Sequence, residues 1–478
     1  MTVPGSNANR GPAVKGRLLF ESAQLLRCTL TVVLAVSLFV TSATSARAAG
    51  LIRDAEIESL LRDYARPIFK AAGLSRQNVR IHLIGARSFN AFVVDGRNMF
   101  FHVGTLMRSE TPNQVIGVIA HEAGHIAGGH LSRLRQAVSG AQTTSLMLRL
   151  LILAATAAGA AAGANVGAAG AGALLGGEGI TQRYVLSYRR AEEASADQAA
   201  LSYLNATQQS AKGMLDTFRY LADQNLGSLR YADPYVQSHP FPQQRIANLR
   251  EKAQRSPYFN KRDPGILQIR HDMMRAKLSG FLDNPQTVLN RYPNSDQSTQ
   301  ARYARAIASY RRSGLGAFLP QIDALLQQQP NNPYFHELKG QFLFKSGESR
   351  RAVPSLRKAV ELAPDEPLIR LLLAQALLAS AQNAQRVNVA EVDEVISHLR
   401  RALVKETCSA RGYRQLATAY GLKRDTANAM LASAFAYQYE GKPDLAKRQA
   451  RDAKKAFPPG SRNWLKADDI LKVKHSGC

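Results

Sequence analysis

The sequence predicts a mainly α-helical chain of the α+β class, with a small β-sheet near its start and helical repeats at its end. Val79–Ile84 and Ala91–Val103 alternate apolar and polar residues as strands do, the second around an Asp-Gly turn. Apolar residues recur at helical spacing through Leu51–Ala72. At 478 residues and 45% apolar composition, the chain is too long for one hydrophobic core. We therefore expect a globular domain over residues 49–262 and a repeat domain over residues 263–478.

The first 48 residues have the parts of a secretory signal peptide. Basic residues precede the uncharged run Cys28–Ser45, and Ala46-Arg47-Ala48 offers small residues for cleavage before Ala49. The strongly apolar part, Leu30–Val40, is short for a membrane span of about 20 residues, so an uncleaved anchor is the weaker alternative. We expect export from the cytoplasm and removal of residues 1–48.

The formal net charge of +26 raises the question of a nucleic-acid partner. Removing residues 1–48 takes away five Lys or Arg residues and one Glu, which leaves +22 on the exported chain. The basic residues are spread along helical patterns, in pairs such as Arg350-Arg351 and Lys454-Lys455, as on solvated helix faces. Export and this spread argue against nucleic acid, whereas peripheral contact with an anionic membrane surface stays open.

The segment 150–177 is uncharged and consists mostly of Ala and Gly. Its length would allow a membrane span, but Ala and Gly contribute little transfer free energy. We expect a loop or a closely packed helical element, with membrane-surface contact as the alternative. After it, Thr181–Leu204 is predicted to be helical, and a loop-rich stretch is expected up to about Arg262.

A period of 34 residues relates small residues and prolines in the second half of the chain: Ala306, Gly340 and Ala374, and also Pro330 and Pro364. This is the period of tetratricopeptide repeats, each a pair of packed helices. In the unit that starts at Pro333, Gly340 would let the two helices approach. A last unit has residues of the same kind at the same offsets: Ala434, Ala446, Ala453 and Pro458. The shared offsets favour an α-helical solenoid over a generic helical bundle.

The motif His121-Glu122-Ala123-Gly124-His125 is the sequence HExxH on a predicted helix that runs from Pro112 to Leu134. Residues four apart lie on one helix face, so both imidazoles can bind one Zn²⁺. Glu122 beside them could accept a proton from a zinc-activated water and pass it to a leaving amine.

A catalytic zinc needs a third protein ligand. His130 is one residue short of the position in HExxHxxGxxH, and a shift of one residue turns a helical side chain by about 100°, away from the metal. The next predicted helix offers Glu193 and Asp197, which share a face. Glu193 could ligate the metal while Asp197 accepts the ring N–H of a ligating histidine. Glu192 is the alternative ligand.

With further patterns, these residues resemble the HExxH zinc metallopeptidases of the CAAX prenyl protease and HtpX family, a gluzincin-type fold. The further patterns are Asn90-Ala91-Phe92 before a strand, Glu193-x-x-x-Asp197, and His239-Pro240 followed by Arg245-Ile246. The resemblance covers about residues 51–255 as the peptidase and, more loosely, the rest of the chain as tetratricopeptide repeats. It implies one Zn²⁺ per chain, bound by His121, His125 and Glu193, with Glu122 as general base and acid.

The same resemblance implies a periplasmic endopeptidase that cleaves misfolded or misassembled proteins, chiefly of the outer membrane. The repeats would recruit substrate or an assembly complex, and a chaperone-like role is compatible with them. A rival interpretation is a non-catalytic scaffold in which only the repeats act. The intact set of His121, Glu122, His125 and Glu193 argues against that rival.

The resemblance places His239 and Arg245 in a second polar cluster near the metal. Two roles stay open: His239 could block the open zinc position, or it could act with Arg245 to stabilise the oxyanion. The remaining histidines are expected to be ordinary surface or core residues. Cys408 and Cys478 would be the only cysteines of the exported chain, and we predict that they form a disulfide.

Overall fold

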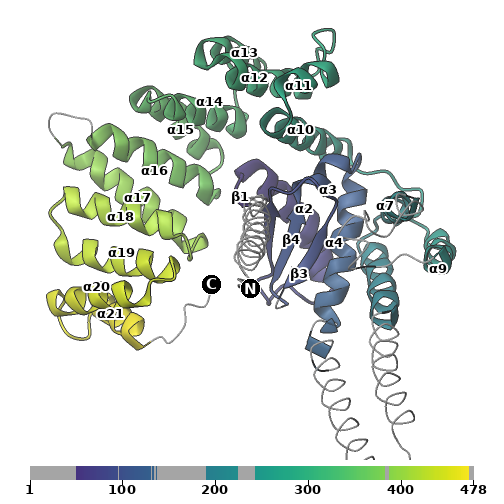
Figure 1. Ribbon diagram of the computed structural model, residues 1–478, viewed down its shortest axis with the longest axis horizontal. Helices are drawn as coiled ribbons and strands as arrows, with labels where there is room; N and C mark the ends of the chain where they lie inside the picture. Colours follow the sequence, from purple (N-terminus) through teal and green to yellow (C-terminus); the bar gives the residue numbers. More distant parts are fainter. Residues whose placement is uncertain are drawn as a thin grey trace, which may run out of the picture. The chain divides into compact units, whose positions relative to one another are not determined.

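The computed structural model describes residues 50–94, 96–130, 132–133, 136, 190–223, 239, 243–382 and 387–472. The predicted class is confirmed, because helices dominate these residues and a single four-stranded sheet precedes the helical repeats (Figure 1). The elements before the repeats are β1 (Leu51–Ile52), α2 (Ala55–Ala71), β2 (Arg80–Ile84), β3 (Ala91–Val94), β4 (Asn98–His102), α3 (Val103–Arg108), α4 (Pro112–Ala127), α7 (Lys212–Asp223), α9 (Gln243–Gln254) and α10 (Gly265–Leu282).

The sheet has the strand order β1-β2-β4-β3. β2 and β4 are parallel, with Leu83 opposite Phe101, while β1 and β3 are antiparallel to their neighbours. Leu83, Met99 and Phe101 are buried in the core shared with α2 and α4, and the alternate residues His82 and Phe100 are partly exposed. This alternation is the period-2 pattern of a sheet with one buried face.

The N-terminal helix starts later than predicted. Leu51–Ile52 pairs with β2 as a short strand, and Asp54 then accepts a hydrogen bond from the backbone N–H of Ile57 as the N-cap of α2. The expectation of a helix from Leu51 was therefore wrong, because an aspartate cap fixes the start of the helix after an apolar pair that can also serve as a strand.

Helix α4 begins as predicted and ends early. Pro112 occupies its first turn, and Thr111 with Gln114 forms a capping box. The helix stops at Ala127, where Gly128 is the C-cap and Gly129 has a φ of 65°. The predicted continuous helix to Leu134 is interrupted at this point, because Gly129 takes up the left-handed conformation that terminates helices, and the described residues His130, Ser132, Arg133 and Gln136 are helical again after the break.

The stretch predicted to be loop-rich contains two helices, α7 and α9. Met214, Leu215, Phe218 and Leu221 of α7 are buried in the core with α4. Their spacing of three and four residues is the pattern of an amphipathic helix, so the expectation of loops was wrong for this stretch.

The repeat region is a succession of helix pairs (Figure 1). Its elements are α11 (Pro285–Arg291), α12 (Thr299–Ser313), α13 (Leu315–Gln328), α14 (Pro333–Lys345), α15 (Ser349–Leu362), α16 (Pro367–Gln382), α17 (Val389–Lys405), α18 (Ala410–Leu422), α19 (Thr426–Tyr439), α20 (Pro443–Ala456) and α21 (Arg462–Lys472). Gly340 of α14 has the predicted function, since a Cβ there would lie 2.4 Å from Leu356 Cγ of α15.

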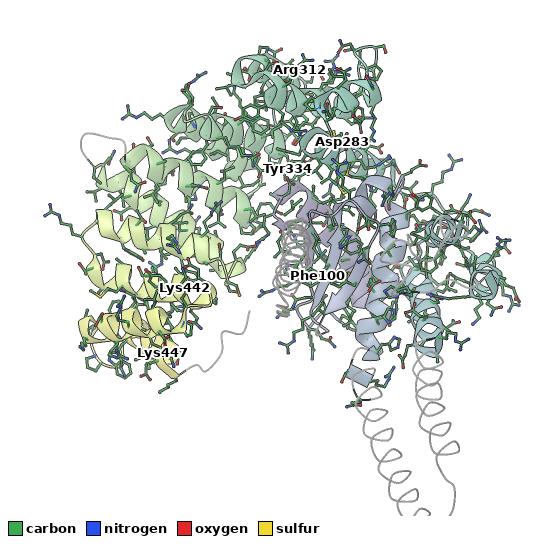
Figure 2. The ribbon with its side chains drawn as sticks, viewed as in Figure 1. Phe100, Asp283, Arg312, Tyr334, Lys442 and Lys447 are labelled. Carbon is green, nitrogen blue, oxygen red and sulfur yellow. The ribbon has the colours of Figure 1, made fainter. Side chains whose placement is uncertain are left out.

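A buried charged network joins α10 to α2 and to the first repeats. Lys277 Nζ lies 2.8 Å from Asp54 Oδ2 and 3.1 Å from Glu56 Oε2, and Tyr303 donates a hydrogen bond to Glu56. The ammonium also lies 6.0 Å from the ring centroid of Tyr334, which Figure 2 labels. Buried charges of this kind are tolerated because each has a partner.

Several predicted features lie outside the described residues: the signal peptide at residues 1–48, the Ala/Gly segment 150–177 and Cys478. Cys408 is disulfide-bonded, and its pairing with Cys478 stays a prediction. Among the described residues, none of the helices is long and apolar enough to cross a membrane.

The first testable consequence concerns His271, which is buried in α10. Its Nε2–H faces the carbonyl of Ser109 at 2.8 Å, and its Nδ1 lies 2.9 Å from the Tyr64 hydroxyl. Burial lowers its pKa to about 4. The unfolded chain binds a proton below about pH 6.5 and the folded chain does not, so stability should fall from about pH 6.5 to about pH 4, by up to about 3 kcal/mol.

Urea unfolding of chelator-treated protein measures this dependence. The slope of unfolding free energy against pH should be smaller in His271→Gln than in the wild type. Equal slopes in the two proteins would contradict the assignment.

Candidate metal centre

Helix α4 presents the three residues of the HExxH motif from its last turns. His121 and Glu122 are fully buried, and the His125 side chain is 10% exposed. The Nε2 atoms of the two imidazoles lie 3.1 Å apart, and their rings are nearly perpendicular. The i,i+4 spacing therefore brings both histidines to one point, as the sequence predicts.

The second helix of the centre spans residues 190–206 and carries both predicted acidic residues. Glu193 Oε2 lies 3.4 Å from His121 Nε2, and Glu193 Oε1 lies 3.4 Å from His125 Nε2. Asp197 Oδ1 lies 3.0 Å from His121 Nδ1, on the opposite edge of that ring. Glu193 thus faces the Nε2 atoms of His121 and His125, the inner nitrogens, which converge on one point. Asp197 faces Nδ1 of His121, an outer nitrogen.

Gly124 makes this arrangement possible. A Cβ atom at Gly124 would lie 2.9 Å from the carbonyl oxygen of Ala196 and 3.0 Å from its Cα. The missing side chain lets α4 and the helix at 190–206 approach at backbone distance. Ala196 lies between Glu193 and Asp197 in the chain, so this contact sets how far both carboxylates are from the histidines.

His239 and Arg245 join the same cluster, from a segment that is remote in sequence. His239 Nδ1 lies 2.8 Å from Glu193 Oε1 and 3.4 Å from His121 Nε2, and His239 Nε2 lies 3.7 Å from Glu122 Oε1. Arg245 contacts both carboxylates, with Nε 2.5 Å and Nη2 2.8 Å from Asp197 and Nη1 2.9 Å from Glu193.

His121, His125, Glu193 and His239 form a group whose ligand atoms all lie within 4.8 Å of one another and could hold a metal ion. Burial would lower the pKa of His121, but the carboxylates of Asp197 and Glu193 raise it to about 9. Burial would likewise raise the pKa of Glu193, yet His239 and the other imidazoles lower it. The centre therefore holds an ionised carboxylate among nitrogen donors, which is a donor set that suits a divalent transition metal.

His130 contacts the outer edge of His125. It lies beyond the end of α4, and its Nδ1 is 2.9 Å from His125 Nδ1, outside the group that could hold a metal, so these contacts do not contradict the prediction that it does not ligate the metal. Gly129, with positive φ, turns the chain between α4 and His130. Glu192, the alternative ligand, lies 2.7 Å from His130 Nε2 and outside the four-residue group.

Phe218 is a residue of the centre that the sequence did not reveal. Its ring meets His121 edge-on at a centroid distance of 5.6 Å, and the Arg245 guanidinium lies 5.5 Å from its centroid. The amphipathic spacing of α7 was the signal that could have found it. Phe218 thus gives both polar groups an apolar wall.

The contact at Gly124 generates a prediction. Gly124→Ala should force α4 and the helix at 190–206 apart and lower the affinity for Zn²⁺ by about 10- to 100-fold, as for other changes outside the ligand set. Competition with a chromophoric chelator measures that affinity. The matched control is Gly421→Ala in α18, where a Cβ would meet no atom within 4 Å, and unchanged metal affinity is expected. If Gly124→Ala also bound Zn²⁺ like the wild type, the contact would not control the centre.

Known proteins resemble this chain over the same elements. Residues 51–253 match Peptidase family M48. The Beta-barrel assembly-enhancing protease of Escherichia coli (strain K12) is 24% identical over 409 residues, which cover 83% of this chain and 79% of that protein. The protein of the same name from Yersinia pestis is 23% identical over 356 residues, which cover 71% of this chain and 69% of that protein. The residues that match Peptidase family M48 include every residue of the centre, and the chain is a metallopeptidase.

Proposed function

We propose that this chain is a zinc-dependent endopeptidase of the periplasm that cleaves misfolded or misassembled outer-membrane proteins. The observation that carries the peptidase activity is the convergence of His121, His125 and Glu193 next to Glu122. These residues come from two helices that meet at backbone distance, so their arrangement is rigid.

Zinc is the metal that best fits this donor set. Two imidazoles and one carboxylate are the protein ligands of many catalytic zinc sites, in which a fourth position stays open. His121, His125 and Glu193 would be those ligands. A zinc ion, when bound, supplies a Lewis acid for the scissile carbonyl and activates a water molecule.

Glu122 is the proposed general base and acid. Its side chain is fully buried, and Oε1 is 3.7 Å from Nε2 of His239, a member of the group that could hold a metal. The carboxylate would take a proton from the attacking water at Oε1 and deliver it to the leaving amine.

Asp197 and Arg245 would orient the ligands. Asp197 Oδ1, 3.0 Å from the outer nitrogen of His121, would accept its hydrogen and fix the tautomer whose Nε2 lone pair faces the metal. Arg245 binds Asp197 through two nitrogens and contacts Glu193 through a third. Because both carboxylates already hold the guanidinium, positioning is the role that the contacts favour over contact with an oxyanion.

His239 is proposed to block the open position in the resting enzyme. Its Nδ1 belongs to the group that could hold a metal, and its side chain is buried against Glu193. An imidazole at the fourth position would exclude both water and substrate. Activation would then require His239 to leave.

The substrate and the compartment are supported by similarity. The relatives from Escherichia coli and Yersinia pestis are named as proteases that enhance β-barrel assembly, and the match extends beyond the peptidase domain into the repeats. The repeats, α12 to α21, would recruit the substrate or an assembly complex, since stacked helix pairs present extended surfaces to other proteins. A chaperone-like role would rest on that same surface.

Replacing the proposed base tests the activity. Glu122→Gln should retain zinc while the rate of casein cleavage falls by about 10²- to 10⁴-fold, because an amide cannot accept the proton. Glu251→Gln, at an exposed residue of α9, serves as the matched control and should cleave like the wild type. Wild-type cleavage by Glu122→Gln would refute the role of Glu122.

Removing the proposed block tests His239. His239→Ala should bind zinc and raise both casein cleavage and self-cleavage, because the fourth position opens. Reduced cleavage at unchanged zinc content would instead favour a role in stabilising the transition state. No change in cleavage or metal binding would reject both roles.

A further inference from the structure

The outer nitrogen of His125 faces another histidine. His125 Nε2 points toward Glu193 and His121, and its Nδ1 lies 2.9 Å from His130 Nδ1. The rings of His125 and His130 are nearly perpendicular, with centroids 4.9 Å apart. On the far edge of the second ring, His130 Nε2 lies 2.7 Å from Glu192 Oε2, and Glu192 is held by the guanidinium of Arg133.

We infer that His130 is a positioning residue for metal binding. It lies between Glu192 and the ligand His125, and its tautomer decides which ring nitrogen of His125 carries the hydrogen. The negative charge of Glu192 Oε2, 2.7 Å from His130 Nε2, favours the tautomer of His130 that carries its hydrogen on Nε2 and presents a bare Nδ1. That bare nitrogen can only accept, so the hydrogen of His125 sits on Nδ1. The lone pair of His125 is thereby placed on Nε2, the atom that faces the other ligands.

His130, Glu192 and Arg133 form the His125 relay. Its arrangement is similar to that of the His121 relay, which Asp197 and Arg245 form. In each, the outer nitrogen of a ligand histidine leads to a carboxylate, and an arginine holds that carboxylate. The difference is the second imidazole, because His130 contacts His125 with one ring nitrogen and Glu192 with the other. His130 spans the gap.

Two neighbouring glutamates thus have separate tasks. Successive residues on a helix are turned by about 100°, so Glu193 faces the ligand cluster while Glu192 faces the outer edge of His130. The sequence left Glu192 as an alternative ligand. The contacts instead make it the charged end of the His125 relay.

The backbone around His130 leaves room for its ring. His130 is 4% exposed, and a Cβ atom at Gly128 would lie 2.2 Å from His130 Nε2. Gly128 has φ −71° and ψ −15°, which alanine adopts without strain. Gly128→Ala would therefore displace the ring of His130 without replacing any residue of the His125 relay.

The inference rests on the proposed zinc-dependent function, and zinc affinity of the full chain tests it by chelator competition. His130→Phe should weaken zinc binding by about 10- to 100-fold, the usual effect of removing such a partner. His130→Asn should bind zinc more tightly than His130→Phe, because the side-chain amide of asparagine can occupy the position of His130 Nδ1. His130→Gln, whose amide matches Nε2, should not rescue. His82→Asn, a histidine change on β2 away from the centre, should bind like the wild type.

A tautomer measurement separates positioning from simple packing. In zinc-loaded protein with ¹⁵N-labelled histidine, His125 should show a protonated Nδ1 that exchanges slowly with water. Gly128→Ala and Glu192→Gln should speed that exchange and weaken zinc binding by more than any fall in the unfolding free energy of chelator-treated protein. These two variants keep the test valid if His130→Phe does not fold.

Two failures are distinguishable. A wild-type chain that binds no zinc would remove the proposed function along with the inference. A wild-type chain that binds zinc, with Gly128→Ala and Glu192→Gln binding equally well and showing the same Nδ1–H exchange, would overturn the His125 relay alone.

Discussion

The backbone contact between Gly124 and Ala196 is the constraint on which the centre depends. Each helix alone carries an ordinary pattern: two histidines and a glutamate on α4, two carboxylates on the helix at 190–206. Only their approach at less than normal Cβ distance puts Glu193 within 3.4 Å of both Nε2 atoms. Gly124, the small residue between His121 and His125 in the motif, therefore has a structural role, because it lets the two helices approach each other.

The orientation of the ligand side chains favours the binding of a cation at the centre. Asp197 Oδ1 and His130 Nδ1 lie at the outer ring nitrogens of the ligand histidines, and the two inner Nε2 atoms and the Glu193 carboxylate are turned toward one point. Such a group repels itself unless a proton or a metal ion lies between its members. In the protein without metal, the raised pKa of His121 means that this imidazole holds a proton among the other ligand side chains. Metal binding would release that proton.

Local patterns predicted much of this fold, and contacts between remote segments explain what they missed. The alternation in β2 and β4, the start of α4 and the close helix packing at Gly340 follow from neighbours in sequence. The helix that ends at Ala127 was predicted to continue, because a Gly-Gly pair only weakly signals a helix end. The 2.9 Å contact between His130 and the outer nitrogen of His125 was not predicted, because the break in the helix before His130 was missed. For His239, sequence gives no measure of its distance to Glu193.

Helix α2 connects the core behind the centre to the repeats. Its apolar face packs against the sheet and α4, with Leu61 and Tyr64 buried. Its polar residues reach the other way, where Arg62 pairs with Glu366 of the loop before α16 and Glu56 meets Lys277 and Tyr303. The Arg62 pair is partly exposed and contributes little, whereas the Lys277 network is buried and is costly to break. The buried Lys277 network therefore fixes α10 and the first repeat helices to α2, the helix that packs against α4.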